Sequence, residues 1–281
     1  MSTVTTVRAT TSVPLDARSK ALRRMVMDTV INAGRGHVGP AMSLIEIMRV
    51  LYDDILQVRP KEPLWPERDR CILSKGHGCL ALYAILADKG FFPIETLATF
   101  CGHDSILGGH PEFRIVPGAE ATTGALGHGL SIGIGQAIAL RLRGSHARVF
   151  VVTGDGELDE GAIWEAAMGA SKHHLDNVTA IVDYNKFQSY GPTSVVMELE
   201  PLADKWRSFG WAVREVDGHD VGALRTVLRA IPFHAEKPSV LICHTVKGKG
   251  VPDAESNADW HHKNKLSPDE LEMINSVLGE N

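Results

Sequence analysis

The sequence lacks features that several large classes of protein require. It contains no run of about 18 or more apolar residues, so we expect no membrane-spanning helix. Basic side chains are in the minority, with 29 Lys and Arg against 34 Asp and Glu, a formal net charge of −5, and no basic cluster. Because nucleic-acid-binding domains usually carry a basic patch, the composition argues against a nucleic-acid partner.

Cysteine is also scarce. Cys71, Cys79, Cys101 and Cys243 are widely spaced and form no Cys-x-x-Cys pair. In a chain of this length without a secretory signal, this pattern is typical of free thiols in a reducing compartment and predicts a cytoplasmic protein. The amino terminus is rich in Ser and Thr but has few basic residues, so we expect a flexible tail over residues 1–16 rather than a transit peptide.

Residues 17–281 contain no repeat, low-complexity linker or shift in composition and are predicted to form one domain. Apolar spacing predicts helices over 19–34 and 79–90, and another that begins with Ser43 and Glu46 as a capping box. Loops rich in Gly and His separate these early helices; they are 34–39, 74–78 and 102–112.

From residue 127 onward, predicted strands and helices alternate. The strands are apolar and β-branched, at 148–153, 178–184, 211–217 and 239–245. The helices are 127–144, 160–172, 202–209, 220–230 and a last one with Ser267 as N-cap, Pro268 at its first position and Glu270 closing a capping box. This alternation predicts an α/β fold with a parallel sheet flanked by helices on both faces.

Two predicted strands end in residues suited to a metal ion. Strand 148–153 is followed by Gly-Asp155-Gly156, and strand 178–184 by Asn185. If the strands are neighbours, both side chains lie on the rim where open α/β sheets bind ligands. Carboxylate and amide oxygens suit Mg²⁺, and Gly156 would let a backbone N–H approach a phosphate. The alternative is a pair of ordinary turns.

Several further stretches occur in an order that resembles one enzyme family. They are GRGHVGPAMS (34–43), SKGHGCLALYAIL (74–86), GGHPE (108–112), TTGALGHG (122–129), GDGELDEG (154–161), DYNKFQS (183–189) and VKGKGVPDAESNADWHHKNKLS (246–267). From about residue 17 the chain resembles the diphosphate-binding domain of thiamine diphosphate enzymes, and more narrowly the amino-terminal half of transketolase. The resemblance implies the thiamine diphosphate-binding fold.

The resemblance also implies thiamine diphosphate and a divalent metal, Mg²⁺ or else Ca²⁺ or Mn²⁺, as cofactors. The metal would be bound by the side chains of Asp155 and Asn185 and by the carbonyl of Phe187. Glu160 resembles a family glutamate that links two cofactor sites across a subunit interface. The residues implied to bind the cofactor are His77, Gly124, Leu126, Gly154, Gly156, Glu157 and Asn185.

Four histidines are implied to be catalytic, namely His37, His77, His110 and His261, with His262 as the alternative to His261. An imidazole has an unperturbed pKa of about 6.5 and can therefore give and take protons near neutral pH. In the family such histidines hold and shuttle protons with the hydroxyl and carbonyl oxygens of the sugars.

The implied activity is transfer of a two-carbon ketol unit from a ketose, a sugar phosphate or related sugar, to an aldose acceptor. In the family, the glutamate that bonds the pyrimidine ring of the cofactor lies in a second, pyrimidine-binding domain, which is not found before Asn281. We therefore expect a separate carboxy-terminal subunit that carries this domain and its catalytic glutamate. The two subunits would associate as a heterotetramer containing two copies of each.

Three other functions remain open. A 1-deoxyxylulose-5-phosphate synthase-like or 2-oxoacid-decarboxylating subunit would keep the cofactor but change the chemistry. A non-catalytic regulatory relative would have lost the metal and histidine residues. A dinucleotide-binding oxidoreductase is suggested by GRGHVG (34–39), which matches G-x-G-x-x-G, but here the motif follows a predicted helix rather than a strand.

Overall fold

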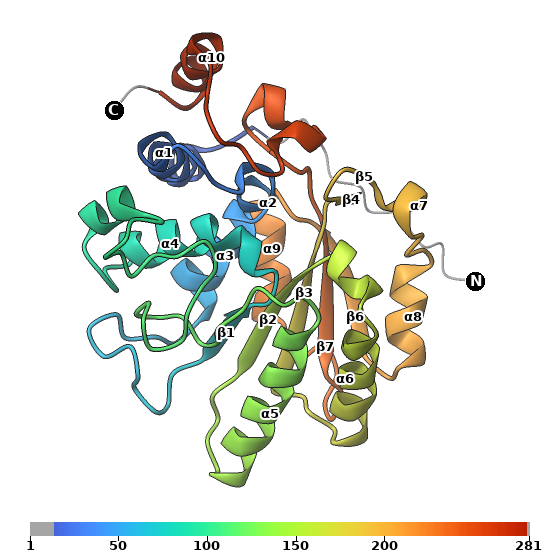
Figure 1. The fold of residues 1–281 in the computed structure, drawn as a ribbon. Helices are drawn as coiled ribbons and strands as arrows, with labels where there is room; N and C mark the ends of the chain where they lie inside the picture. Colours follow the sequence, from blue (N-terminus) through green and yellow to red (C-terminus); the bar gives the residue numbers. More distant parts are fainter. Residues whose placement is uncertain (1–13, 280–281) are drawn as a thin grey trace.

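A computed structural model describes residues 14–279, so most of the predicted tail, residues 1–13, lies outside the described residues. The centre of the fold is a five-stranded parallel sheet with strand order β1-β2-β3-β7-β6 (Figure 1). Its strands are β1 (Arg70–Leu73), β2 (Val149–Gly154), β3 (Val178–Tyr184), β6 (Ala212–Asp217) and β7 (Ser239–His244). A short hairpin is formed by β4 (Phe187–Gln188) and β5 (Gly191–Pro192).

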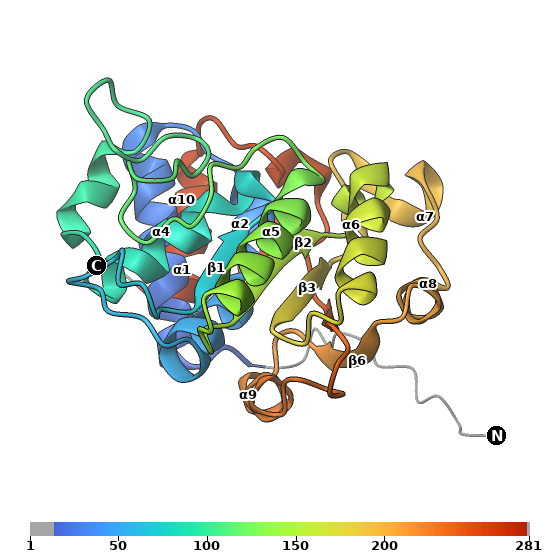
Figure 2. The same cartoon turned by 90° about the horizontal axis from the view of Figure 1, so that it is seen from below.

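Helices cover both faces of the sheet, which confirms the predicted α/β fold. One face is covered by α5 (His128–Leu142), α6 (Gly161–Lys172) and α8 (Leu202–Ser208), and Figure 2 shows α5 and α6 side by side. The other face is covered by α1 (Ala17–Ala33), α2 (Val38–Met42), α3 (Ile45–Val50), α4 (Cys79–Asp88) and α9 (Val221–Arg229). Within the described residues, no helix is both long and apolar enough to cross a bilayer.

Shorter elements complete the chain. A π-helical turn over Leu51–Ile55 extends α3, α7 (Thr193–Val196) follows the hairpin, and α10 (Pro268–Leu278) lies against α1. Single 3-10 turns span Gly76–Gly78, Ile94–Thr99, Gly156–Asp159, Pro252–Ala254 and Ala258–Trp260.

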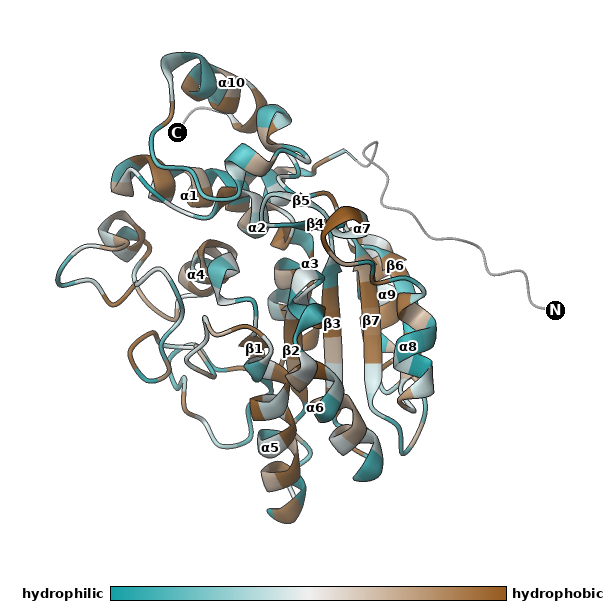
Figure 3. Cartoon of the chain, turned by 45° about the vertical axis from the view of Figure 1, so that its right-hand side comes forward, coloured by the Kyte–Doolittle hydropathy of each residue, from teal (hydrophilic) through white to brown (hydrophobic). Residues whose placement is uncertain are grey.

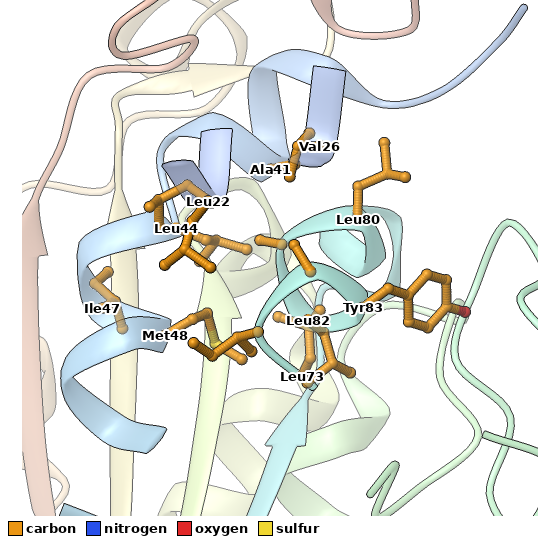
Figure 4. Close-up of a cluster of buried hydrophobic side chains, with 14 of the residues drawn as sticks. Leu22, Val26, Ala41, Leu44, Ile47, Met48, Leu73, Leu80, Leu82 and Tyr83 are labelled. Atoms are coloured by element: carbon orange, nitrogen blue, oxygen red, sulfur yellow. The ribbon is translucent and has the colours of Figure 1, made fainter. Parts of the chain in front are cut away.

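The buried side chains form two apolar clusters, one on each face of the sheet. Successive residues of a strand point to opposite faces. In β2, accordingly, Phe150 and Val152 join the cluster under α1–α4, while Val149 and Val151 join the cluster under α5 and α6. Figure 4 shows part of the first cluster, and Figure 3 shows the strands as an apolar band between the helical layers. Burial on both faces explains why the strands read as continuous apolar runs.

The predicted capping box at Ser43 is wrong. Ser43 instead follows the short helix α2, and its hydroxyl donates to Asp183 Oδ2 at 2.6 Å. Glu46 accepts two hydrogen bonds from Arg23, at 2.6 and 2.9 Å, inside the core. Both side chains are therefore used by distant buried partners rather than by the helix terminus. The box at Ser267 is confirmed, because Ser267 Oγ accepts from the Glu270 N–H and Glu270 Oε2 accepts from the Ser267 N–H.

Candidate active site

A cavity opens at the carboxyl ends of four neighbouring strands. Lys75 follows β1, Asp155 follows β2, Asn185 follows β3 and Lys247 follows β7, and all four residues line the cavity. β2 and β3 pair in parallel up to Gly154 and Asp183, so Asp155 and Asn185 emerge on the same rim, as the two strand ends predicted. Ligands bind at this edge of an open α/β sheet.

The two rim residues are held by the loops that carry them. Asp155 Oδ1 accepts from the Gly156 N–H at 2.8 Å, and its Oδ2 accepts from the Lys186 N–H. Asn185 Oδ1 accepts from the N–H of Phe187 at 3.0 Å. The predicted metal ligands therefore lie together in one hydrogen-bonded arrangement.

The rim holds a buried carboxyl group whose charged form a bound cation would stabilise. Burial, together with the nearby carboxylate of Asp183, raises the pKa of Asp155 to about 7. Within residues 14–279 no group of three His, Cys, Asp or Glu side chains is arranged to hold a metal. A metal here would therefore need amide, main-chain and phosphate oxygens beside the Asp155 carboxylate, and Mg²⁺ accepts such a mixed oxygen set.

A buried polar network is connected to the cavity through Lys75, which lines it. Lys75 Nζ donates to Asp183 Oδ2 at 2.6 Å, and the two side chains are 2% and 0% exposed. The hydroxyls of Ser43 and Thr245 donate to the same carboxylate. Burial raises the pKa of Asp183, but the charge and hydrogen bond of Lys75, together with the hydrogen bonds from Ser43 and Thr245, outweigh it and leave that pKa below its ordinary value.

We expect Lys75→Met to lower the free energy of unfolding by about 3 kcal/mol, because a carboxylate left buried without its counter-charge is strongly destabilising. The measurement is urea denaturation of the cofactor-free chain. The double variant Lys75→Met/Asp183→Asn removes both charges and should be less destabilised than Lys75→Met alone. Equal destabilisation of the two variants would contradict a compensating ion pair.

The four predicted catalytic histidines come from separate segments and meet at the cavity. The ring centroid of His37 lies 5.7 Å from that of His77, 6.2 Å from that of His110 and 5.5 Å from that of His261. His37, His77 and His261 line the cavity, and the ring of His110 lies against Gly124. His262 is outside the lining, with its ring 4.7 Å from that of His37.

Three of these imidazoles are neutral at physiological pH. Burial and the neighbouring His262 lower the pKa of His37 to about 4. Burial and the charge of Lys75 lower the pKa of His77 to about 2, and burial with Lys247 lowers that of His261 to about 3. A neutral imidazole has one donor and one acceptor nitrogen, so each ring can hold a hydroxyl group and exchange a proton with it.

Glycines and a buried carboxylate shape the side of the cavity formed by the 122–129 loop and the end of β2. Gly124 has φ +143°, and a Cβ there would lie 3.2 Å from the ring of His110. Glu157 accepts hydrogen bonds from the N–H groups of Gly127 and Gly154, at 2.9 and 3.1 Å, and from the Ser74 hydroxyl. The carboxylate thus joins the 122–129 loop to the end of β2.

All the predicted cofactor-binding residues and metal ligands line the cavity. They are His77, Gly124, Leu126, Gly154, Gly156, Glu157 and Asn185, together with Asp155 and Phe187. Glu160 is exposed and lies at the N-terminus of α6, beside Gly127. The additional lining residues that sequence reasoning missed are Pro40, Lys75, Gln188, Ser189 and Lys247. Lys75 and Lys247 each precede a glycine in one of the motifs, and this position could have indicated that they lie in the site.

The cavity contains polar atoms that suit a bound group. Gln188 Oε1 and His261 Nδ1 are buried and have no hydrogen-bond partner among the described residues. Lys75 and Lys247 place two amines beside the Asp155 rim, and burial with the charge of Lys75 lowers the pKa of Lys247 to about 8. Amines, a metal-binding rim and unpaired buried atoms together match the chemistry of a diphosphate cofactor.

Comparison with known proteins points to one family. The family described as "Transketolase, thiamine diphosphate binding domain" matches residues 16–281. The chain is 43% identical to one of the subunits of the apulose-4-phosphate transketolase of Phocaeicola vulgatus, covering 88% of each chain. It is 41% identical to a 6-deoxy-6-sulfo-D-fructose transketolase subunit of Clostridium sp., covering 89% of this chain and 91% of that one.

The solved structures that resemble this chain include transketolases. The chain superposes on Pichia stipitis transketolase in complex with sedoheptulose-7-phosphate with a TM-score of 0.88 at 31% identity. The superposition covers 94% of this chain but 40% of that one. Campylobacter jejuni transketolase gives a TM-score of 0.87 at 29% identity, with 42% of its chain covered. The chain therefore spans less than half the length of these solved transketolases.

Proposed function

The chain belongs to the transketolase family, as its thiamine diphosphate-binding domain, and we propose that it is one subunit of a two-subunit transketolase. The reaction is transfer of a two-carbon ketol unit from a ketose to an aldose acceptor. The observation that carries this proposal is the group of neutral histidines directly beside the rim of Asp155 and Asn185. The test is a ketol-transfer assay of the reconstituted enzyme.

Asp155, Asn185 and the carbonyl of Phe187 would hold Mg²⁺, with Ca²⁺ or Mn²⁺ as substitutes, because all three offer hard oxygen ligands. The flanking amines of Lys75 and Lys247 would neutralise diphosphate charge. Bound thiamine diphosphate supplies the electron sink that allows a carbon–carbon bond beside a carbonyl to break and re-form. This chain's side chains bind that group, orient it and handle the protons of the sugar.

The histidines would serve the two sugar substrates. His37 and His261 would hold hydroxyl and carbonyl oxygens of the acceptor, and His77 and His110 would serve the donor and the cofactor. A neutral imidazole takes a proton from a hydroxyl oxygen as the carbonyl forms and returns it when the reaction runs backwards. Their lowered pKa values leave the rings of His37, His77 and His261 unprotonated at neutral pH, so each ring keeps a nitrogen that can accept a hydrogen bond from a sugar hydroxyl.

We expect His110→Ala to slow turnover by about 100-fold or more, the usual effect of losing a general acid–base group. The affinity for thiamine diphosphate should change by less than about threefold, because the ring contributes to proton transfer rather than to the diphosphate site. Steady-state kinetics of the reconstituted enzyme and calorimetry of the cofactor give the two quantities. His103→Ala, on the same loop and exposed, is the matched control. Weak cofactor binding with normal turnover would instead assign His110 to the cofactor site.

The partner would be a carboxy-terminal transketolase subunit with the pyrimidine-binding domain and its glutamate. Two relatives that this chain matches over most of their length are named as transketolase subunits, which supports a second chain. Self-association is supported by exposed apolar side chains on neighbouring helices, Ile132 on α5 and Met168 on α6. A heterotetramer with two copies of each subunit would satisfy both contacts. Free cysteine thiols support a cytoplasmic location.

The substrate would be a sugar with an anionic group. One of the two relatives is named for a sugar phosphate, apulose-4-phosphate, and the other for a sulfonated sugar, 6-deoxy-6-sulfo-D-fructose. Both groups are tetrahedral anions on a small polyol, so a sugar phosphate or sugar sulfonate is the substrate class that we propose here. The 1-deoxyxylulose-5-phosphate synthase-like and decarboxylating alternatives are not favoured, because the relatives are transketolases.

A further inference from the structure

Two backbone segments meet at the mouth of the active site. The N–H of Gly36 donates to the Lys263 carbonyl and the N–H of Lys263 donates to the Gly36 carbonyl, both at 2.8 Å. In such an antiparallel pair, the residues before and after Gly36 lie opposite those after and before Lys263. Arg35 is therefore opposite Asn264, and His37 is opposite His262.

The alternation of side chains gives this bridge an inner and an outer face. A Cβ built on Gly36 would lie 2.9 Å from Leu80 and 3.0 Å from Val30, so position 36 faces the apolar core. The neighbouring positions 35 and 37 consequently face away from the core. His37 lines the active-site cavity, and Arg35 lines a second cavity beside it, formed largely by residues 98–105.

Among residues 14–279, Arg35 has no partner for its charge. Its side chain is exposed, and it makes no ion pair or side-chain hydrogen bond with the residues described here. Asp104 also lines the second cavity, but no hydrogen bond joins it to Arg35. His262 is exposed as well and lies next to His37. Arg35 and His262 are thus exposed side chains close to His37, and the proximity of each helps to lower the pKa of that ring.

We propose that Arg35 and His262 form an anion subsite that binds the phosphate or sulfonate of the sugar. The inference rests on the proposed ketol transfer and adds that this chain, and not only its partner, recognises the charged end of the substrate. A guanidinium matches the tetrahedral oxygens of phosphate and sulfonate through two parallel hydrogen bonds, and the His262 ring supplies a further donor. His37, between the anion subsite and the cofactor cavity, would then meet the hydroxyl groups of the same sugar.

The first experiment tests anion binding without catalysis. The full chain, labelled with ¹⁵N in its histidines, is titrated with inorganic phosphate and, in a separate arm, with methanesulfonate. We expect saturable shifts of the His262 and His37 ring resonances, and an affinity about tenfold lower in Arg35→Gln, the usual loss of one charge-assisted bidentate contact. Arg143→Gln, an exposed arginine at the end of α5, is the control. Shifts that are equal in all three proteins, or absent, overturn the subsite. The arm with the tighter binding identifies the preferred anion.

The second experiment uses the reconstituted enzyme. For an anionic ketose, Arg35→Gln should lower kcat/KM about tenfold through KM, whereas for the uncharged ketose of the same length the change should be less than about twofold. Equal losses with both sugars would mean that Arg35 only positions His37 and would refute the inference. If the wild-type complex shows no ketol transfer at all, the proposed function fails, and the phosphate titration still decides whether the anion subsite exists.

Discussion

Asp155→Ala is expected to abolish Mg²⁺-dependent binding of thiamine diphosphate. Of the three proposed metal ligands, Asp155 is the one with a carboxyl group, and this residue is 3% exposed on the rim of the cavity. Even changes in the groups that orient metal ligands cost 10- to 100-fold in metal affinity, so loss of the ligand itself should cost at least about 100-fold. Calorimetric titration of the cofactor with and without Mg²⁺ measures the effect.

Two further variants make this result specific. Asp155→Asn keeps the shape of the side chain but removes the charge, and we expect nearly the same loss of metal affinity. Asp204→Ala removes an exposed carboxylate on α8, away from the cavity, and should bind as the wild type does. If Asp155→Ala retains the wild-type dependence on Mg²⁺, the metal is held elsewhere.

The affinity of the Asp155 site for Mg²⁺ is expected to depend on pH. Because burial and Asp183 raise the pKa of Asp155 to about 7, protons compete with the metal for this carboxylate just below neutral pH. Protonation removes the negative charge, so Mg²⁺ affinity should fall about tenfold per pH unit below pH 7 and level off above it. His37, His77 and His261 do not titrate in this range, since their pKa values are about 4, 2 and 3. Lys247, whose pKa is lowered to about 8, loses its proton only toward the upper end of the range, so the fall below pH 7 reports Asp155. A flat profile between about pH 5.5 and 8 would contradict this assignment.

The Asp155 rim could be predicted because it depends on local sequence. Each strand is an apolar run that ends at a polar residue, and parallel strands have their carboxyl ends at one edge of the sheet. Only the adjacency of β2 and β3 had to be assumed, and the structure confirms it. The capping box at Ser267 was equally predictable, because its partners are three residues apart.

Features that depend on distant contacts could not be predicted in this way. β1 is four residues long and follows a charged stretch, so its periodicity was too weak to identify. Without β1 and the strand order, nothing indicated that Lys75 and Lys247 reach the same cavity as Asp155. At Ser43 the local pattern predicted a helix cap that does not form. Its hydroxyl instead donates a hydrogen bond to the buried carboxylate of Asp183, 140 residues away.

The histidine cluster could be predicted only in part. Its members are spread from residue 37 to residue 261, and spacing alone could not bring them together. The order of the motifs suggested it through resemblance to a family. The structure adds what the motifs could not contain, namely the separations of the rings and the burial that keeps three of them neutral.

The purified chain, supplied with thiamine diphosphate and Mg²⁺, is expected to show no ketol transfer on its own. Within residues 14–279 the cavity lies at one edge of the five-stranded parallel sheet, with residues of the short β4–β5 hairpin in its lining. We therefore expect these residues to form one side of the proposed two-subunit site. Catalysis of this kind depends on charged groups held in a dry, preorganised site, and an open cavity leaves the reacting bonds in water. The superposition on the Pichia stipitis transketolase covers 40% of that chain.

Addition of the second subunit should raise the rate by at least about 1,000-fold, because proximity and exclusion of water each contribute several kcal/mol to such reactions. Calorimetry of the isolated chain should still detect cofactor binding through Asp155, which separates an incomplete site from a misfolded protein. The complex made with Asp155→Ala should stay inactive, which assigns the restored activity to this cavity rather than to the partner. Ketol transfer by the isolated chain at a rate close to that of the complex would refute the two-subunit site, since the second side would then add nothing to catalysis.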